Sequence, residues 1–432
     1  MTDLRPGTPR RPSAATSLVP LRWRDHAPLV AAALAMQSVA WLLIVGVADI
    51  ARDSYGFFSF SDIAGTYYPY AIRMAGGMAA YRDFFIEYPP LFVPLLAALG
   101  NPGSQSDFLM RFAALMVVFM LAAGVVTALA AVDDRSSRRP YVVASVFSAL
   151  VLALGPITAN RYDAVVALVL ALALLFTMRE DWELAGVALG VGFALKITPA
   201  MLVPLVLMLA PARRALRALA GFSVAALLPF LWVFLLGGES GARLAEMIGY
   251  HLTRPLEIES VMATGLWIGR LAGPKLDVVT GSGSQVIVSQ AAVTIASVST
   301  LVLLGALALT FALVWRRRSA ILADKRLVAL ASLATMLGSL VGSKVLSPQY
   351  FVWIIPAAAL VAVDRKVLGV ILALGLLGTH VLFPANYLAF AYDQLPGPIL
   401  LVIVRNLLVL GSFALSLWYL WSLPRVEQTA DA

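Results

Sequence analysis

The chain has 432 residues, of which 61% are hydrophobic and only 13% are charged, with a net charge of +8 and no cysteine. Soluble domains are nearer half apolar and a quarter charged, so this composition excludes an ordinary soluble protein. In so apolar a chain an excess of Lys and Arg reports membrane topology, so the charge does not argue for nucleic acid, and the lack of cysteine excludes disulfides and thiol chemistry.

Apolar segments recur along the chain, and segments of about 17–25 residues are long enough to cross the ~30 Å hydrocarbon core of a bilayer. We therefore predict an all-α polytopic membrane protein with about twelve transmembrane helices. They are expected at 28–49, 107–131, 141–158, 162–178, 184–195, 198–210, 218–236, 286–314, 327–342, 349–363, 367–383 and 398–421. The first apolar run exceeds the length of a signal-peptide core, so we expect a retained span after a tail at 1–27, one transmembrane domain at 28–422 and a tail at 423–432.

Arginine clusters set the expected orientation of these helices. If the N-terminus is cytoplasmic, "DDRSSRRP" (133–140), "PARRALR" (211–217) and "WRRRSAILADKR" (315–326) all fall inside, as the positive-inside rule requires. Two long connections, 50–106 and 237–285, then lie outside. Because they are rich in aromatic and aliphatic residues, we expect short amphipathic helices on the outer membrane surface.

The first outer loop carries the strongest catalytic candidate, Asp62, which is followed by a tyrosine-rich stretch. A carboxylate held there can act as general base for a hydroxyl nucleophile. The alternative is a solvated loop acid or a helix N-cap, since Ser61-Asp62 precedes "IAGTYYPYAIRM".

The same loop contains "YRDFFIEYPP" (81–90), in which two prolines enforce an extended turn at Tyr88. The simplest interpretation of this stretch is an interfacial aromatic belt in which Arg82, Asp83 and Glu87 pair with one another.

In "NRYDAVVALVL" (160–170), Arg161 and Asp163 stand at the outer start of a predicted span. They suit a polar wall for a sugar or phosphate. Equally, they suit a snorkelling arginine with an acid at a helix N-terminus.

Two lysines stand in matching positions at the outer ends of spans, each shortly before a proline: Lys196 in "LKITPAML" and Lys344 in "GSKVLSPQYFVW". Two ammonium groups at one depth suit a single anionic group such as a lipid phosphate, and independent snorkelling is the alternative.

The second outer loop contains "YHLTRPLEIES" (250–260), whose His251 and Arg254 suit a phosphate or a sugar hydroxyl. Arg270 adds positive charge to this loop, and an interfacial histidine without a role is the alternative.

Taken together and in order, "YRDFFIEYPPLF", "RYDAVVALVLALALL", "ELAGVALGVGFALKITPAMLVPLVLML", "RPLEIES" and "SKVLSPQYFVWIIP" resemble the C-type glycosyltransferase superfamily. The sequence is most similar to glycosyltransferase family 87, the polyprenyl-phosphate-mannose-dependent α-mannosyltransferases of actinobacteria. The similarity runs from about residue 28 to about residue 365.

The resemblance implies a role for each matching residue. Asp62 is expected to be the catalytic base. The residues expected at the donor phosphate are Lys196, Lys344, Arg270, His251 and Arg254, and those expected at the sugar or acceptor are Arg161, Asp163, Tyr88 and Gln349. The resemblance implies no metal or other cofactor, which agrees with the lack of an Asp-x-Asp motif in the first outer loop.

The function expected from the resemblance is transfer of a hexose, first of all mannose, from a polyprenyl-phosphate donor to a glycolipid or glycan acceptor. The reaction is expected to be a metal-independent inverting displacement on the extracytoplasmic side of a bacterial plasma membrane, serving glycolipid biosynthesis in the cell envelope. Partners are then the donor, the acceptor and membrane lipids, with no nucleic acid. The alternatives are a polytopic transporter or lipid flippase, the same enzyme class with an arabinose or glucose donor, and an inactive partner subunit.

Overall fold

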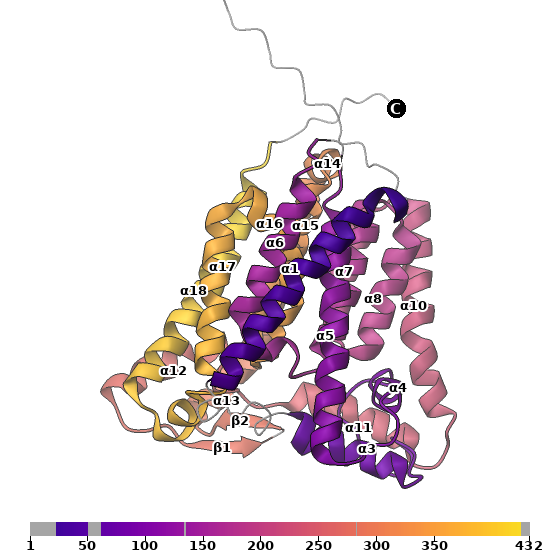
Figure 1. Cartoon of the computed structure of the whole chain (residues 1–432). Coiled ribbons are helices and arrows are strands. Elements are labelled where there is room, and N and C mark those ends of the chain that lie inside the picture. Colours follow the sequence, from indigo (N-terminus) through magenta and orange to yellow (C-terminus); the bar gives the residue numbers. More distant parts are fainter. Residues whose placement is uncertain (1–22, 51–61, 134, 282, 425–432) are drawn as a thin grey trace, which may run out of the picture.

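The computed structural model describes residues 23–50, 62–133, 135–281 and 283–424 (Figure 1). Long helices lie side by side and form a bundle, with short helices and one hairpin gathered at one end. The principal helices are α1 Trp23–Ile50, α5 Gln105–Ala130, α6 Arg139–Leu154, α7 Asp163–Met178, α8 Trp182–Leu195, α9 Val203–Leu209, α10 Ala212–Phe234, α13 Gln290–Arg316, α15 Arg326–Gly342, α16 Phe351–Asp364, α17 Lys366–Leu382 and α18 Pro396–Trp421.

Each of the twelve ranges predicted to span overlaps one of these helices, and the all-α class is confirmed. Within the described ranges, six helices are long and apolar enough to cross a bilayer by length and composition: α1, α5, α6 with its 3-10 extension Gly155–Thr158, α10, α13 and α18. The other predicted spans are shorter apolar helices, two of them preceded by 3-10 turns at Thr198–Leu202 and Pro348–Tyr350.

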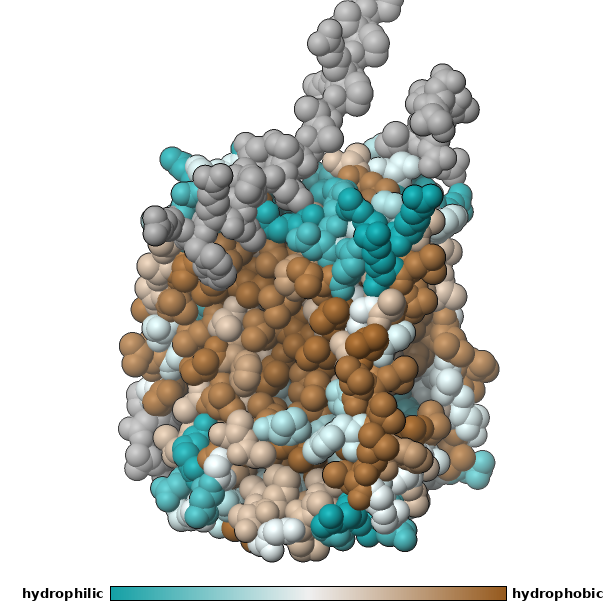
Figure 2. Space-filling view, turned by 90° about the vertical axis from the view of Figure 1, so that its right-hand side faces the viewer, coloured by the Kyte–Doolittle hydropathy of each residue, from teal (hydrophilic) through white to brown (hydrophobic). Residues whose placement is uncertain are grey.

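The outside of the bundle is apolar, as a membrane protein requires. Large apolar side chains are exposed along α10 (Val224, Leu227) and along α13 (Leu301, Leu304). Figure 2 shows one side of this surface, where a hydrophobic belt separates two more hydrophilic ends. By contrast, α15 and α16 are apolar on all sides and almost wholly buried, so they form the centre of the bundle.

Glycines in α8 allow its close contact with α10. A Cβ at Gly186 would lie 2.0 Å from the carbonyl oxygen of Ala218, and a Cβ at Gly190 would lie 2.4 Å from that of Phe222. Small residues four apart let two membrane helices approach to backbone contact. This explains the "AGVALG" part of the motif in α8 as packing rather than chemistry.

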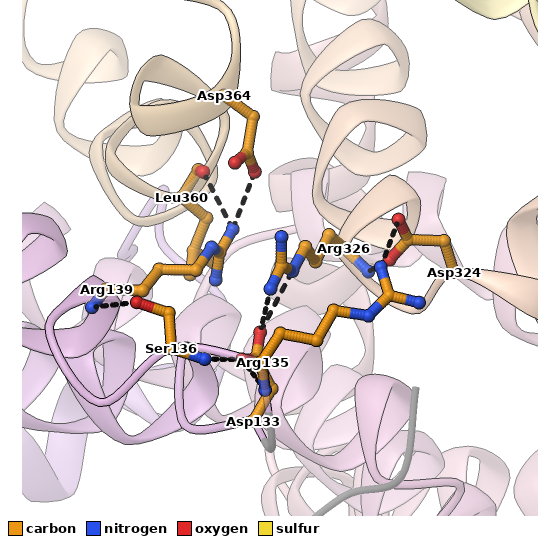
Figure 3. A network of polar contacts seen from close by, with 8 residues as sticks. All are labelled: Asp133, Arg135, Ser136, Arg139, Asp324, Arg326, Leu360 and Asp364. Atoms are coloured by element: carbon orange, nitrogen blue, oxygen red, sulfur yellow. Dashed lines mark hydrogen bonds and ion pairs between the residues drawn. The ribbon is translucent and has the colours of Figure 1, made fainter. Parts of the chain in front are cut away.

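The segments predicted to lie inside meet at one end of the bundle, beside α14 Arg318–Ala323 (Figures 1 and 3). The residues joined there come from three segments far apart in sequence. The ion pairs are Arg139–Asp364 (2.8 Å), Arg326–Asp133 (2.7 Å) and Arg135–Asp324 (3.4 Å). The arginine clusters therefore share one end, as the charge pattern predicted.

The opposite end is built from the two long loops. The first contains a π-helical turn, Ile63–Tyr67, followed by α3 Tyr68–Ala75 and α4 Phe92–Ala97. The second contains α11 Ser240–Thr253, a 3-10 turn Val261–Ala263 and α12 Thr264–Ala272, and a π-helical turn at Ala389–Asp393 packs nearby.

The second loop also forms a hairpin that the sequence analysis did not predict. Strands β1 Val278–Gly281 and β2 Ser284–Ile287 pair antiparallel, with Val278 opposite Ile287. The span predicted from residue 286 therefore begins too early, because residues 286 and 287 belong to β2 and α13 begins at Gln290.

Candidate active site

A polar cleft lies at the end of the bundle formed by the long loops. About 620 Å³ of space, part of it open to solvent, lies between side chains from segments that are far apart in sequence. These segments are the start of the first loop (62–66), the Glu-Tyr-Pro turn (87–89), Tyr162, the α8 terminus (196–197), the end of α11 with the hairpin turn (250–254 and 283) and the Ser-Pro-Gln-Tyr segment (347–350).

Asp62 lies at the mouth of this cleft in an ion pair with Arg161. The distance from Oδ2 of Asp62 to Nε of Arg161 is 2.6 Å, and the side chains are 30% and 9% exposed, respectively. Although Asp62 immediately precedes a helical turn, its side chain makes no capping hydrogen bond. The N-cap interpretation is therefore wrong, and the carboxylate is positioned by a buried guanidinium instead.

Lys196 lies in a box of aromatic rings above a buried acid. Its Nζ is 2.6 Å from Oδ1 of Asp163, and it lies 4.8–5.0 Å from the ring centres of Trp353, Tyr350 and Tyr162. The indole of Trp353 donates a hydrogen bond to the same Oδ1, at 2.6 Å. Aromatic faces attract a cation, so this arrangement fixes an ammonium group at the wall of the cleft.

Asp163 itself does not face the cleft. Its side chain is only 1% exposed, and its carboxylate accepts a hydrogen bond from the ammonium group of Lys196. Arg161 is paired with Asp62 and likewise is not one of the residues that line the cleft.

The second loop contributes His251 and Arg254. Nε2 of His251 lies 3.0 Å from the carbonyl oxygen of Glu87, so this nitrogen carries the proton and donates it. Burial lowers the pKa of His251, with the carbonyl contact acting in the opposite direction, so a neutral ring is favoured. Arg254 donates to Oγ of Ser284 in the hairpin at 2.7 Å.

The segment that carries Arg254 is held in place by two acidic residues that follow it. Glu257 accepts hydrogen bonds from the backbone N–H of Leu346 (2.7 Å) and the hydroxyl of Ser347 (3.0 Å), while Glu259 forms a buried ion pair with Arg405 of α18 (3.1 Å). The acids of "RPLEIES" thus tie the second loop to the Ser-Pro-Gln-Tyr segment and to the bundle. These contacts of Glu257 and Glu259 fix the position of Arg254 relative to Tyr350.

Tyr88 and Gln349, both predicted at the sugar or acceptor, do line the cleft. Tyr88 packs against Phe92 with ring centres 4.5 Å apart and edge-on against Tyr162 at 5.2 Å. Aromatic side chains packed in this way present a rigid wall.

Two predicted residues lie elsewhere. Lys344 donates to the carbonyl oxygen of Leu252 (2.7 Å) and lines a neighbouring groove of about 950 Å³, which shares only Arg254 with the cleft. Arg270 donates from Nε to the side-chain oxygen of Gln394 (3.0 Å) and is not a cleft residue. The prediction that Lys196 and Lys344 meet at one anion does not match this geometry, because Lys196 lines the cleft whereas Lys344 lines the groove and donates to Leu252.

The cleft also contains residues that were not predicted from the sequence, above all Glu87. Arg82 and Asp83 pair with each other at 2.9 Å, whereas Glu87 accepts a hydrogen bond from the hydroxyl of Tyr70. No local pattern separates Glu87 from its charged neighbours, since only the tertiary fold brings it beside α11. Among the residues that the structure describes, no group of three or more His, Cys, Asp or Glu is arranged to hold a metal ion.

The apolar helices and the ionic cleft at their end define a polytopic membrane protein with a candidate active site for a charged or polar substrate. The model of glycosyltransferase family 87 matches residues 85–348, which run from the Glu-Tyr-Pro turn to the Ser-Pro-Gln-Tyr segment. The chain therefore belongs to glycosyltransferase family 87 and is a membrane glycosyltransferase. The match confirms the family predicted from the motifs, although it begins after Asp62. A search of curated proteins found no match for this sequence.

Proposed function

We propose that this glycosyltransferase moves a hexose, first of all mannose, from a polyprenyl-phosphate donor to a glycolipid or glycan acceptor. The observation that carries the proposal is the placing of a carboxylate, Asp62, and fixed cations, Lys196 and Arg254, around one cleft at the end of apolar helices. A lipid-linked sugar phosphate presents its head group at the membrane surface, where such a cleft lies, while its chain remains in the membrane.

The proposed reaction is one direct displacement. The acceptor oxygen attacks the anomeric carbon and loses its proton to Asp62, while the bond from that carbon to the phosphate oxygen breaks. The electron pair leaves with the phosphate, so the polyprenyl phosphate gains one negative charge. Lys196 and Arg254 stabilise this charge in a site partly shielded from water. A single displacement inverts the configuration, so a β-linked donor gives an α-linked product.

The neighbouring groove suggests a path for the prenyl chain. Arg254 lines both the cleft and the groove, and the groove continues past Leu256 and Ile287 to Val293 at the start of α13. We propose that the donor phosphate lies beside Arg254 and that the chain runs along this groove, where Lys344 meets the lipid side of the donor. Arg270 keeps no part in this scheme, since its guanidinium is used by Gln394.

The proposed topology has twelve spans, with the arginine-rich end in the cytoplasm of a bacterium and the cleft outside the plasma membrane. Because the chain contains no cysteine, single cysteines report on sidedness directly. In intact cells a membrane-impermeant maleimide should label Glu246→Cys on α11 and should label Arg213→Cys at the start of α10 only after permeabilisation. The reverse pattern would contradict the orientation.

Membership of a glycosyltransferase family sets aside the transporter or flippase alternative that the apolar helices alone left open. The identity of the sugar is tested by giving purified wild-type protein radiolabelled polyprenyl-phosphate donors bearing mannose, arabinose or glucose, together with a membrane glycolipid extract. We expect mannose to move fastest, to form an α-linkage, and to transfer equally well in EDTA. Faster transfer of arabinose or of glucose would contradict the assignment of mannose as the donor sugar. Loss of transfer in EDTA would contradict the metal-independent mechanism.

A further inference from the structure

Glu87 is a second carboxylate in the cleft, and the proposed displacement does not use it. It belongs to the turn that leads into Pro89 and Pro90, and its side chain lines the cleft, as does that of Asp62. The hydroxyl of Tyr70, on α3, donates a hydrogen bond to its Oε2. Its own backbone carbonyl accepts from His251, so both ends of the residue are held in place.

The charge of Glu87 is not neutralised by a neighbouring cation. Within the described parts of the chain, the ion pairs of the cleft join Asp62 to Arg161 and Lys196 to Asp163, and none includes Glu87. Burial raises the pKa of Glu87 and the charge of Asp62 adds to this effect, while hydrogen bonds from Tyr70, Tyr88 and its own backbone N–H act in the opposite direction. A half-buried carboxylate held by neutral donors alone retains lone pairs that can accept hydrogen bonds from further O–H or N–H groups.

The surroundings of Glu87 favour a neutral, hydroxyl-rich ligand. Tyr88, Tyr250 and Tyr350 line the same cleft and offer apolar faces with polar tips. A sugar ring has apolar C–H faces for such rings and hydroxyl donors for a carboxylate. The cations that suit the phosphate, Lys196 and Arg254, come from other segments of the cleft wall.

We propose that Glu87 is a specificity-determining residue that accepts hydrogen bonds from ring hydroxyls of the transferred sugar, and that Tyr70 positions its carboxylate. This inference rests on the proposed function and deepens it, because it assigns the sugar subsite within the same cleft. A site that bonds a particular hydroxyl rejects a sugar that lacks it, since the carboxylate is then left unpaired.

The test combines Glu87→Gln and Tyr70→Phe with a series of monodeoxy polyprenyl-phosphate sugars. We expect Glu87→Gln to lower kcat/KM for the full sugar by roughly ten- to hundredfold, and Tyr70→Phe to lower it less. Wild type should lose a similar factor with one particular deoxy sugar, whereas Glu87→Gln should be nearly insensitive to that deletion, as a double-mutant cycle requires of a direct contact. Glu246→Gln, an exposed acid on α11, is the matched control and should behave as wild type.

The other outcomes contradict either the role of Glu87 alone or the proposed function as well. An active wild type with unchanged kcat/KM in Glu87→Gln would overturn this inference alone. So would a loss that is the same for every deoxy sugar, because it would indicate a structural role or a role as the base. Absence of transfer by wild type from any polyprenyl-phosphate sugar would overturn the proposed function and this inference with it.

Discussion

Replacement of Asp62 by Asn is expected to lower kcat by roughly 10²–10⁴-fold, the usual contribution of a general base. The amide keeps the shape of the carboxylate beside Arg161 but cannot accept the acceptor proton. Donor binding, which we propose depends on Lys196 and Arg254, should change little. Initial rates of sugar transfer over a range of donor concentrations separate the two quantities.

The matched control is Asp83→Asn, in the same loop. Asp83 is paired with Arg82 at the surface and does not line the cleft, so its loss should leave kcat unchanged. An Asp62→Asn enzyme with near wild-type kcat would contradict the assignment of the base. Equal loss of activity in Asp62→Asn and Asp83→Asn would also contradict it, because the loss would then come from a disturbed loop and not from the missing proton acceptor.

Replacement of Lys196 by Met is expected to lower kcat/KM for the lipid-linked donor by roughly 10²–10³-fold, which is typical for loss of one preorganised group that stabilises transition-state charge. The ammonium group is held at the cleft wall by Asp163 and three aromatic rings, so no neighbouring side chain can replace it without rearrangement. Lys344→Met should raise KM with a smaller effect on kcat, because Lys344 lines the groove. Lys366→Met, at the opposite end of the bundle, should have no effect.

A loss of folding in Lys196→Met must be separated from a loss of chemistry. Removing one partner of a buried ion pair costs about 3–5 kcal/mol, because the other charge stays buried. The double variant Lys196→Met/Asp163→Asn removes both charges, and the amide oxygen can still accept from Trp353. We expect it to recover thermal stability but not transfer. Recovery of transfer as well would contradict a role for Lys196 at the donor phosphate.

The sequence predicted the helices well because their signal is local. A run of apolar residues such as that of α13 is sufficient to indicate a membrane helix, and arginine clusters indicate which ends lie together. Asp62, Lys196, His251 and Arg254 could be singled out as candidates because each is a charged or titratable residue at an apolar border, and all four line the cleft.

What the sequence could not predict depends on contacts between distant segments. The place of Lys344 is set by α11, whose Leu252 carbonyl oxygen binds its ammonium group. The placing of Glu87 depends on hydrogen bonds with Tyr70 and with His251, which is 164 positions away. Likewise the hairpin has strands of only four residues, and such short strands are held by their neighbours rather than by propensity.

The most direct test of the account is a comparison of donors with purified wild-type protein, one labelled sugar and one glycolipid extract. The sugar is supplied either on a polyprenyl phosphate or on a nucleotide diphosphate, with no other enzyme present. The account predicts that label enters the glycolipid only from the polyprenyl-phosphate donor, with release of one polyprenyl phosphate per sugar transferred. Transfer from the nucleotide sugar, or none from any polyprenyl-phosphate sugar, would contradict it.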